Sequence, residues 1–135
     1  MLSLLILGSA LSVSAQNVKR TLDLDRFSSI GLGISANVYL TPGNEQRVEV
    51  EGREEIIGLL DTEVRNGSWN IKFTERNVRN TGKIDIYITL PEVEELSIGG
   101  SGKIVAERPF DGMGDLQFSI GGSGVIEFAG TARRL

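Results

Sequence analysis

The sequence predicts an all-β domain, arranged as a right-handed β-helix or β-solenoid-like stack with glycine-rich corners, for three reasons. Apolar and polar residues alternate with a period of two in several segments, as in strands that bury one face. One segment recurs 22 residues further along the chain, which is typical of stacked repeats. The 17 glycines favour tight turns, because glycine destabilises helix interiors. A β-sandwich with two glycine-rich hairpins is the alternative.

Residues 1–15 form the first distinct segment, an uncharged apolar run that ends in small residues. This pattern is typical of a secretory signal peptide, with Val13 and Ala15 at three and one residues before the cut. We expect cleavage between Ala15 and Gln16, and a single domain over residues 16–135. The apolar run is shorter than the roughly 20 residues that span a bilayer, so we expect no transmembrane segment. A buried helix or strand is the alternative reading.

Residues 83–90 are the clearest strand, because polar and apolar side chains alternate there without interruption. Pro91 ends this strand, since proline cannot donate a ladder hydrogen bond. One face of the strand would carry four aliphatic side chains, Ile84, Ile86, Ile88 and Leu90.

Two shorter alternating runs, residues 38–41 and 48–51, are separated by a Pro-Gly pair at positions 42–43. Proline followed by glycine favours a turn, so these runs predict a hairpin. The Asn-Gly pair at 66–67 predicts a second turn, because both residues tolerate positive φ. Residues 53–60 are the one helical candidate, and Gly58 keeps it short.

The repeat joins residues 96–104, Leu-Ser-Ile-Gly-Gly-Ser-Gly-Lys-Ile, to residues 118–126, Phe-Ser-Ile-Gly-Gly-Ser-Gly-Val-Ile. Each copy can supply a strand, a corner and a second strand, with Ile98 stacked on Ile120 and Ile104 on Ile126. Neighbouring coils pack backbone to backbone at a corner, which leaves little room for a side chain. The predicted corner residues are Gly99, Gly100, Gly102, Gly121, Gly122 and Gly124.

The composition argues against several classes of chemistry. Histidine and cysteine are both absent from the 135 residues, which removes imidazole bases, thiolate nucleophiles and disulfides. A net charge of −4 disfavours nucleic acid. Residues 99–103 lack the first glycine of a phosphate-binding loop, and residues 111–115 lack the ligand spacing of a calcium loop. We therefore expect no enzymatic activity, no cofactor and no metal site.

Three aromatic side chains are candidates for contact with a sugar ring. Trp69 alternates with Ile71 and Phe73, so the core is its expected place. Tyr39 and Tyr87 fall on the polar faces of their strands. They are therefore the predicted ligand-binding residues.

Several segments together resemble the head GIN domain of putative auto-transporter adhesins. They are Asp-Arg-Phe-Ser-Ser-Ile at 25–30, Ala-Asn-Val-Tyr-Leu-Thr-Pro-Gly at 36–43, Val-Glu-Val-Glu-Gly at 48–52, Ile-Tyr-Ile-Thr-Leu-Pro at 86–91 and both Gly-Ser-Gly repeats. The resemblance covers about residues 22–130 and implies a secreted or cell-envelope β-helical protein with no established catalytic residues. Members usually continue with further Gly-Ser-Gly coils, which leaves two alternatives: the chain is truncated at its C-terminus, or it is complete and its last coil has an open edge that pairs with another chain or needs a cap.

These observations predict an exported, non-enzymatic, adhesin-like module for binding or surface presentation. We expect it in the periplasm, on the outer membrane surface or outside the cell, with a protein or a glycan as its partner and no nucleic acid. One alternative is a carbohydrate-active β-helix enzyme, since such folds can carry paired carboxylates. The other is a structural envelope protein that forms homo-oligomers through open β edges.

Overall fold

The computed structural model describes residues 17–110 and 116–129. The predicted signal peptide with its cleavage site, the acidic segment 111–115 and the C-terminal residues 131–135 lie outside the described residues. One short helix, α1 (Glu54–Ile57), accompanies the strands. The strands are β1 (Asn17–Leu22), β2 (Ser29–Leu32), β3 (Asn37–Pro42), β4 (Arg47–Arg53), β5 (Val64–Arg65), β6 (Ser68–Ile71), β7 (Asp85–Leu90), β8 (Glu95–Ile98), β9 (Lys103–Ala106), β10 (Gln117–Ile120) and β11 (Val125–Phe128).

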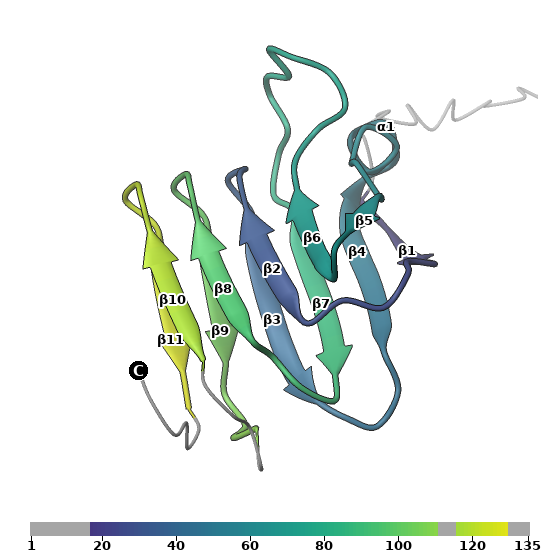
Figure 1. The fold of residues 1–135 in the computed structure, drawn as a ribbon. Helices are drawn as coiled ribbons and strands as arrows, with labels where there is room; N and C mark the ends of the chain where they lie inside the picture. Colours follow the sequence, from purple (N-terminus) through teal and green to yellow (C-terminus); the bar gives the residue numbers. More distant parts are fainter. Residues whose placement is uncertain (1–16, 111–115, 130–135) are drawn as a thin grey trace, which may run out of the picture.

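The strands form two facing sheets (Figure 1). One sheet has the order β1-β4-β7-β3-β9-β11 and the other β10-β8-β2-β6-β5. The pairs β2 and β3, β6 and β7, β8 and β9, and β10 and β11 each place one strand in each sheet. Within each sheet these strands pair in parallel, whereas β1, β4 and β5 make antiparallel pairs. The all-β prediction is confirmed, with two mixed sheets.

The two copies of the repeat lie one on the other in register. Ile120 is the parallel partner of Ile98, and Ile126 is the partner of Ile104, as the repeat predicted. The predicted corner glycines follow β8 or β10 in the connections to β9 and β11. The 22-residue spacing is therefore the length of chain that contributes one strand to each of the two sheets before the next strand pair begins.

The expected hairpin between residues 38–41 and 48–51 is wrong. Strand β7 lies between β3 and β4, parallel to β3 and antiparallel to β4. The physical reason is burial: Ile86 and Ile88 of β7 are almost fully buried, and a central position gives this strand a hydrogen-bonded neighbour on each side. The Pro-Gly turn at 42–43 thus connects two strands that are next-nearest neighbours.

The other local predictions agree with the structure. Asn66 and Gly67 have φ values of 52° and 74°, and they connect the antiparallel strands β5 and β6. Helix α1 buries Ile56 and Ile57 at one end of the core, within the predicted segment 53–60. Trp69 is fully buried, with its ring centroid 5.6 Å from that of Phe27.

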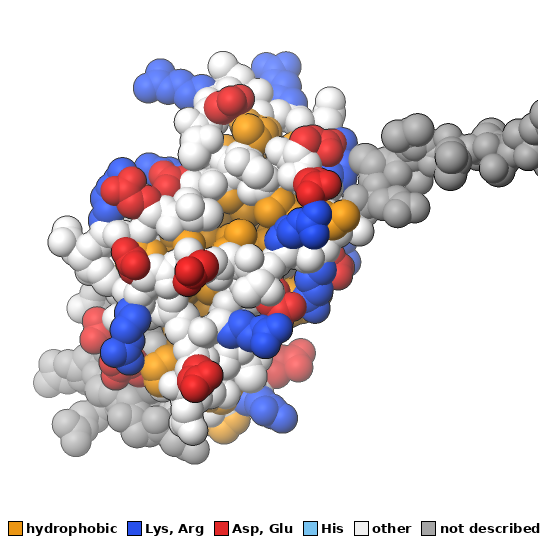
Figure 2. All heavy atoms as spheres, turned by 90° about the vertical axis from the view of Figure 1, so that its right-hand side faces the viewer, with side chains coloured by type: hydrophobic (Ala, Val, Ile, Leu, Met, Phe, Trp, Pro, Cys, Tyr) orange, Lys and Arg blue, Asp and Glu red, His pale blue; other side chains and the backbone are white. Residues whose placement is uncertain are grey.

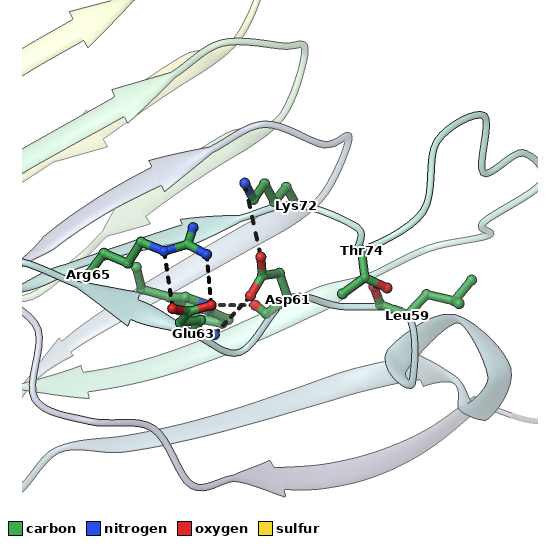
Figure 3. Close-up of polar contacts among 7 residues, drawn as sticks. Leu59, Asp61, Glu63, Arg65, Lys72 and Thr74 are labelled. Atoms are coloured by element: carbon green, nitrogen blue, oxygen red, sulfur yellow. Dashed lines mark hydrogen bonds and ion pairs between the residues drawn. The ribbon is translucent and has the colours of Figure 1, made fainter.

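A group of polar contacts fixes the segment beside Trp69. The indole N–H donates a hydrogen bond of 2.9 Å to the carbonyl of Asp61. The Asp61 carboxylate in turn accepts from the backbone N–H of Glu63 at 2.9 Å, with Lys72 Nζ 4.0 Å away (Figure 3). Arg65 reaches both carboxylate oxygens of Glu63. These contacts fix the position of the Asp61 carbonyl, which accepts the hydrogen bond of the Trp69 indole. Without that acceptor the buried indole N–H would be unpaired, which would destabilise the fold.

The two ends of the stack differ. At the β10 and β11 end, Phe118 is 38% exposed and Ile120 is 48% exposed, although their partners Leu96 and Ile98 are buried. At the opposite end lie β1, β5 and α1, and acidic and basic side chains are interspersed there (Figure 2). Charged side chains protect an edge from pairing with another chain. Strand β10 carries no charged residue.

Candidate ligand-binding face

The structure brings the two predicted binding residues together on the outer face of the six-stranded sheet. Tyr39 of β3 and Tyr87 of β7 are register partners. Their neighbours along each strand, Leu40 and Ile86 among them, are buried in the core, so both tyrosines point to solvent. The two rings are stacked, with centroids 5.3 Å apart and an interplanar angle of 18°.

Lys19 of β1 extends this row on the other side of Tyr87. Its Nζ lies 4.7 Å from the centroid of the Tyr87 ring and 3.6 Å from a carboxylate oxygen of Glu49. Strands β1 and β3 lie on opposite sides of β7 in the sheet order, so the Tyr87 ring stands between Lys19 and Tyr39. A sugar that stacks on an aromatic ring needs a free ring face. Both faces of the Tyr87 ring are thus occupied, whereas Tyr87 covers one face of the Tyr39 ring.

No motif in the sequence marks Lys19 as a residue of this face. A lysine in an exposed strand is ordinarily a solvated residue. It reaches Tyr87 only because β1 pairs with β4 and β4 pairs with β7. This arrangement depends on contacts between distant segments, so no local pattern in residues 17–22 could indicate it.

Carboxylates surround the tyrosine pair on this face. Asp85 is buried, accepts a hydrogen bond of 3.1 Å from the Asn37 side chain and lies 3.7 Å from Lys83 Nζ. Partial burial raises the pKa of Tyr87, and the negative charges of Asp85 and Glu51 raise it further, while Lys83 lowers it. The protonated phenol, which can donate a hydrogen bond, is thus favoured at Tyr87.

We expect Tyr87 to ionise above pH 10 in the folded protein. The chain has two tyrosines, so the variant Tyr39→Phe leaves Tyr87 as the one phenol that an absorbance titration detects. The unfolded pKa is about 10. Because the folded pKa is higher, this group's contribution to stability is present below pH 10 and is lost as the pH rises through the folded pKa. Adding Asp85→Asn should lower the midpoint, and a midpoint at or below 10 in the folded single variant would contradict the assignment.

A hollow of about 170 Å³ lies beside Tyr39 on the side away from Tyr87. Tyr39, Leu40 and Thr41 of β3 line one side of it, and Val105, Glu107 and Arg108 line the other. Val105 is the register partner of Tyr39 and is 8% exposed. A larger hollow of about 250 Å³ lies near the turns, with Arg26, Asn44 and Glu92 among its lining residues.

The described residues offer little for metal chemistry. Among them, no group of three or more His, Cys, Asp or Glu side chains is placed to hold a metal ion. Three carboxylates on the tyrosine face have cationic neighbours: Glu49 with Lys19 and Arg47, Asp85 with Lys83, and Glu127 with Lys103. The arrangement is suited to binding through stacking, hydrogen bonds and charge.

Comparison with known families identifies the domain. Residues 26–135 match the family described as "Putative auto-transporter adhesin, head GIN domain". The chain belongs to this family. The match includes both tyrosines and both copies of the glycine repeat, so the family resemblance of the sequence is confirmed. No curated protein matches this head GIN domain.

Solved structures share the fold of this head GIN domain. A putative adhesin from Bacteroides fragilis has a TM-score of 0.76 and 22% identity, over 88% of this chain and 56% of that one. A putative lipid binding protein from Parabacteroides distasonis has a TM-score of 0.70 and 20% identity, over 90% and 52% of the two chains. A putative adhesin from Parabacteroides merdae has a TM-score of 0.67 and 14% identity, over 79% and 45%. The chain thus spans about half the length of these relatives.

The family and its structural neighbours are described as adhesins, or in one case as lipid-binding, and a surface or exported location fits these descriptions. Within residues 17–110 and 116–129, no helix has both the length and the apolar character needed to cross a membrane.

Proposed function

We propose that this head GIN domain is a non-enzymatic binding module exported to the cell envelope, and that it presents the outer face of its six-stranded sheet to a protein or a glycan. In this proposal residues 1–15 are a signal peptide and residues 16–135 form one domain. The four strand pairs are then the coils of a right-handed β-helix-like stack. The observation that carries the proposal is the stacked pair of Tyr39 and Tyr87 on that face.

Aromatic side chains fixed on a rigid sheet are favourable binding elements. They bring a large contact area and lose little conformational freedom on binding. Tyr87 is held on both ring faces, by Lys19 and by Tyr39, so its position is set before a partner arrives. The charged residues around the pair resemble the polar rim of a protein interface. The adhesin and lipid-binding descriptions of the structural neighbours agree with a binding role.

The test compares binding of the full chain and of the double variant Tyr39→Ala and Tyr87→Ala to a glycan array and to bacterial and host cell surfaces. We expect the double variant to bind at least ten-fold more weakly, because both rings leave the contact. The matched control is Ser119→Ala, an exposed residue of β10 in the other sheet, which should bind as the unchanged protein does. Binding that is the same in the double variant would contradict the choice of face.

A second candidate function, self-assembly in the envelope, is favoured by one specific observation. Phe118 and Ile120 of the last coil are exposed in positions that are buried in the coil before it. Analytical ultracentrifugation of the same samples separates the two functions. Self-assembly would be supported by two results together. The protein would associate in a concentration-dependent way that Ile120→Lys abolishes, and it would bind to none of the tested surfaces.

A further inference from the structure

We infer that the hollow beside Tyr39 holds one ring of a neutral sugar, packed against the side of Tyr39 that faces β9 and hydrogen-bonded by Glu107 and Arg108. This inference rests on the proposed function, because it names the ligand class and the subsite on the proposed face.

The hollow has an apolar wall and an apolar floor. Tyr87 covers one face of the Tyr39 ring, and the other face is turned toward β9, where Val105 is the register partner of Tyr39. Val105 belongs to the outer face of the sheet, yet it is 8% exposed and lies outside the main core cluster. One face of a pyranose ring carries several C–H groups, and such a face packs well against an aromatic ring.

The rim of the hollow supplies hydrogen-bonding groups of both kinds. Glu107 and Arg108 are exposed side chains that follow β9, and Thr41 adds a hydroxyl from β3. A carboxylate accepts hydrogen bonds and a guanidinium donates them. Adjacent sugar hydroxyls both donate and accept, so this pair of side chains matches them. Glu107 and Arg108 carry opposite charges, so this part of the rim has no net charge, which suits a ring without a net charge.

The volume of the hollow sets the size of the ligand. About 170 Å³ is below the roughly 300–1,000 Å³ of sites for drug-sized ligands. A single sugar ring is the appropriate scale. A shallow site of this kind binds a single sugar weakly, with a Kd on the order of 1 mM. Stronger attachment then requires several such contacts at once.

The test uses the full chain and saturation-transfer NMR with methyl glycosides of glucose, galactose, mannose and N-acetylglucosamine, and with methyl glucuronide as the charged probe. We expect at least one neutral glycoside to bind, and Tyr39→Ala and Arg108→Ala each to weaken it at least ten-fold. Tyr39→Phe should retain binding, because it keeps the ring face. Arg76→Ala is the charge-matched control, since Arg76 is an exposed arginine in the connection between β6 and β7.

Three outcomes would overturn the inference: no neutral glycoside binds, only the glucuronide binds, or binding survives both Tyr39→Ala and Arg108→Ala. Each is distinguishable from failure of the proposed function. If the double tyrosine variant still loses attachment to cells or to the array, the face binds something other than a neutral sugar ring and the proposed function stands. If that variant attaches normally, the proposed function itself is contradicted.

Discussion

The substitution Gly102→Ala is expected to lower the free energy of unfolding by about 3 kcal/mol, the upper end of the usual cost of overpacking. A Cβ at this position would lie 2.8 Å and 2.9 Å from the backbone carbonyl oxygens of Ile34 and Ala36, and it would overlap with a Leu32 methyl group. The leucine side chain can rotate away from a new methyl group. The two carbonyls cannot, because they belong to the backbone of the neighbouring connection between β2 and β3, and the Ala36 carbonyl accepts a hydrogen bond from the backbone N–H of Lys103.

The matched control for this prediction is Gly99→Ala in the same Gly-Gly-Ser-Gly corner. Nothing lies within 4 Å of a Cβ at Gly99, and its φ is not positive. This variant should therefore stay within about 1 kcal/mol of the unchanged protein. Urea denaturation followed by circular dichroism measures both variants. Equal stabilities would contradict the view that the corner glycines are required by contact between coils.

The same contact recurs in the next copy of the repeat, where the connection between β10 and β11 lies on the connection between β8 and β9, which explains why the repeat includes its glycines. A Cβ at Gly124 would lie 2.7 Å from the carbonyl oxygen of Gly102 and 2.5 Å from a methyl group of Ile98. A Cβ at Gly122 would lie 2.5 Å from the carbonyl oxygen of Gly100. Each of these glycines is thus required by the coil beneath it. The open space around a Cβ at Gly99 indicates that not every glycine in the motif has this role.

Features of the fold that depend on neighbouring residues were predictable from the sequence. The alternation in residues 83–90, the Asn-Gly turn at 66–67 and the 22-residue repeat each specify a local backbone or a register, and the structure agrees with each. The hairpin between residues 38–41 and 48–51 was not predictable in this way. A Pro-Gly turn favours local closure, but only the long-range pairing of β7 with both β3 and β4 decides which strands are neighbours.

In the candidate site too, local features were predictable from the sequence and long-range features were not. The polar-face positions of Tyr39 and Tyr87 follow from alternation within each strand. Their stacking does not, because it depends on the parallel register of two strands that are distant in sequence. The hollow beside Tyr39 requires in addition that β9 pair with the opposite edge of β3. The alternation of residues within each strand therefore identifies the two tyrosines of the face, whereas their arrangement depends on the pairing of distant strands.

The substitution Trp69→Ala is expected to lower the free energy of unfolding by roughly 3–5 kcal/mol, the range for removal of a large buried aromatic side chain. Trp69 is fully buried between the two sheets and packs against Phe27. Alanine would leave a cavity that the surrounding strands cannot close, because parallel pairing with β2 holds β6 in register. It would also remove the indole donor to the Asp61 carbonyl.

Phe118→Ala provides the control for the loss of an aromatic side chain at a corresponding position in the same sheet. Phe118 points to the same side of the five-stranded sheet as Trp69, but it is 38% exposed at the end of the stack. Removing it should cost less than removing Trp69, roughly 1–2 kcal/mol, because more than a third of its surface faces water and its ring contact is with Phe128 at the same end of the stack. Urea denaturation followed by circular dichroism serves for both variants, since Trp69 is the one tryptophan and its fluorescence is lost with it. Similar losses in the two variants would mean that the last coil is as tightly packed as the centre, and the exposed end would then have no special role.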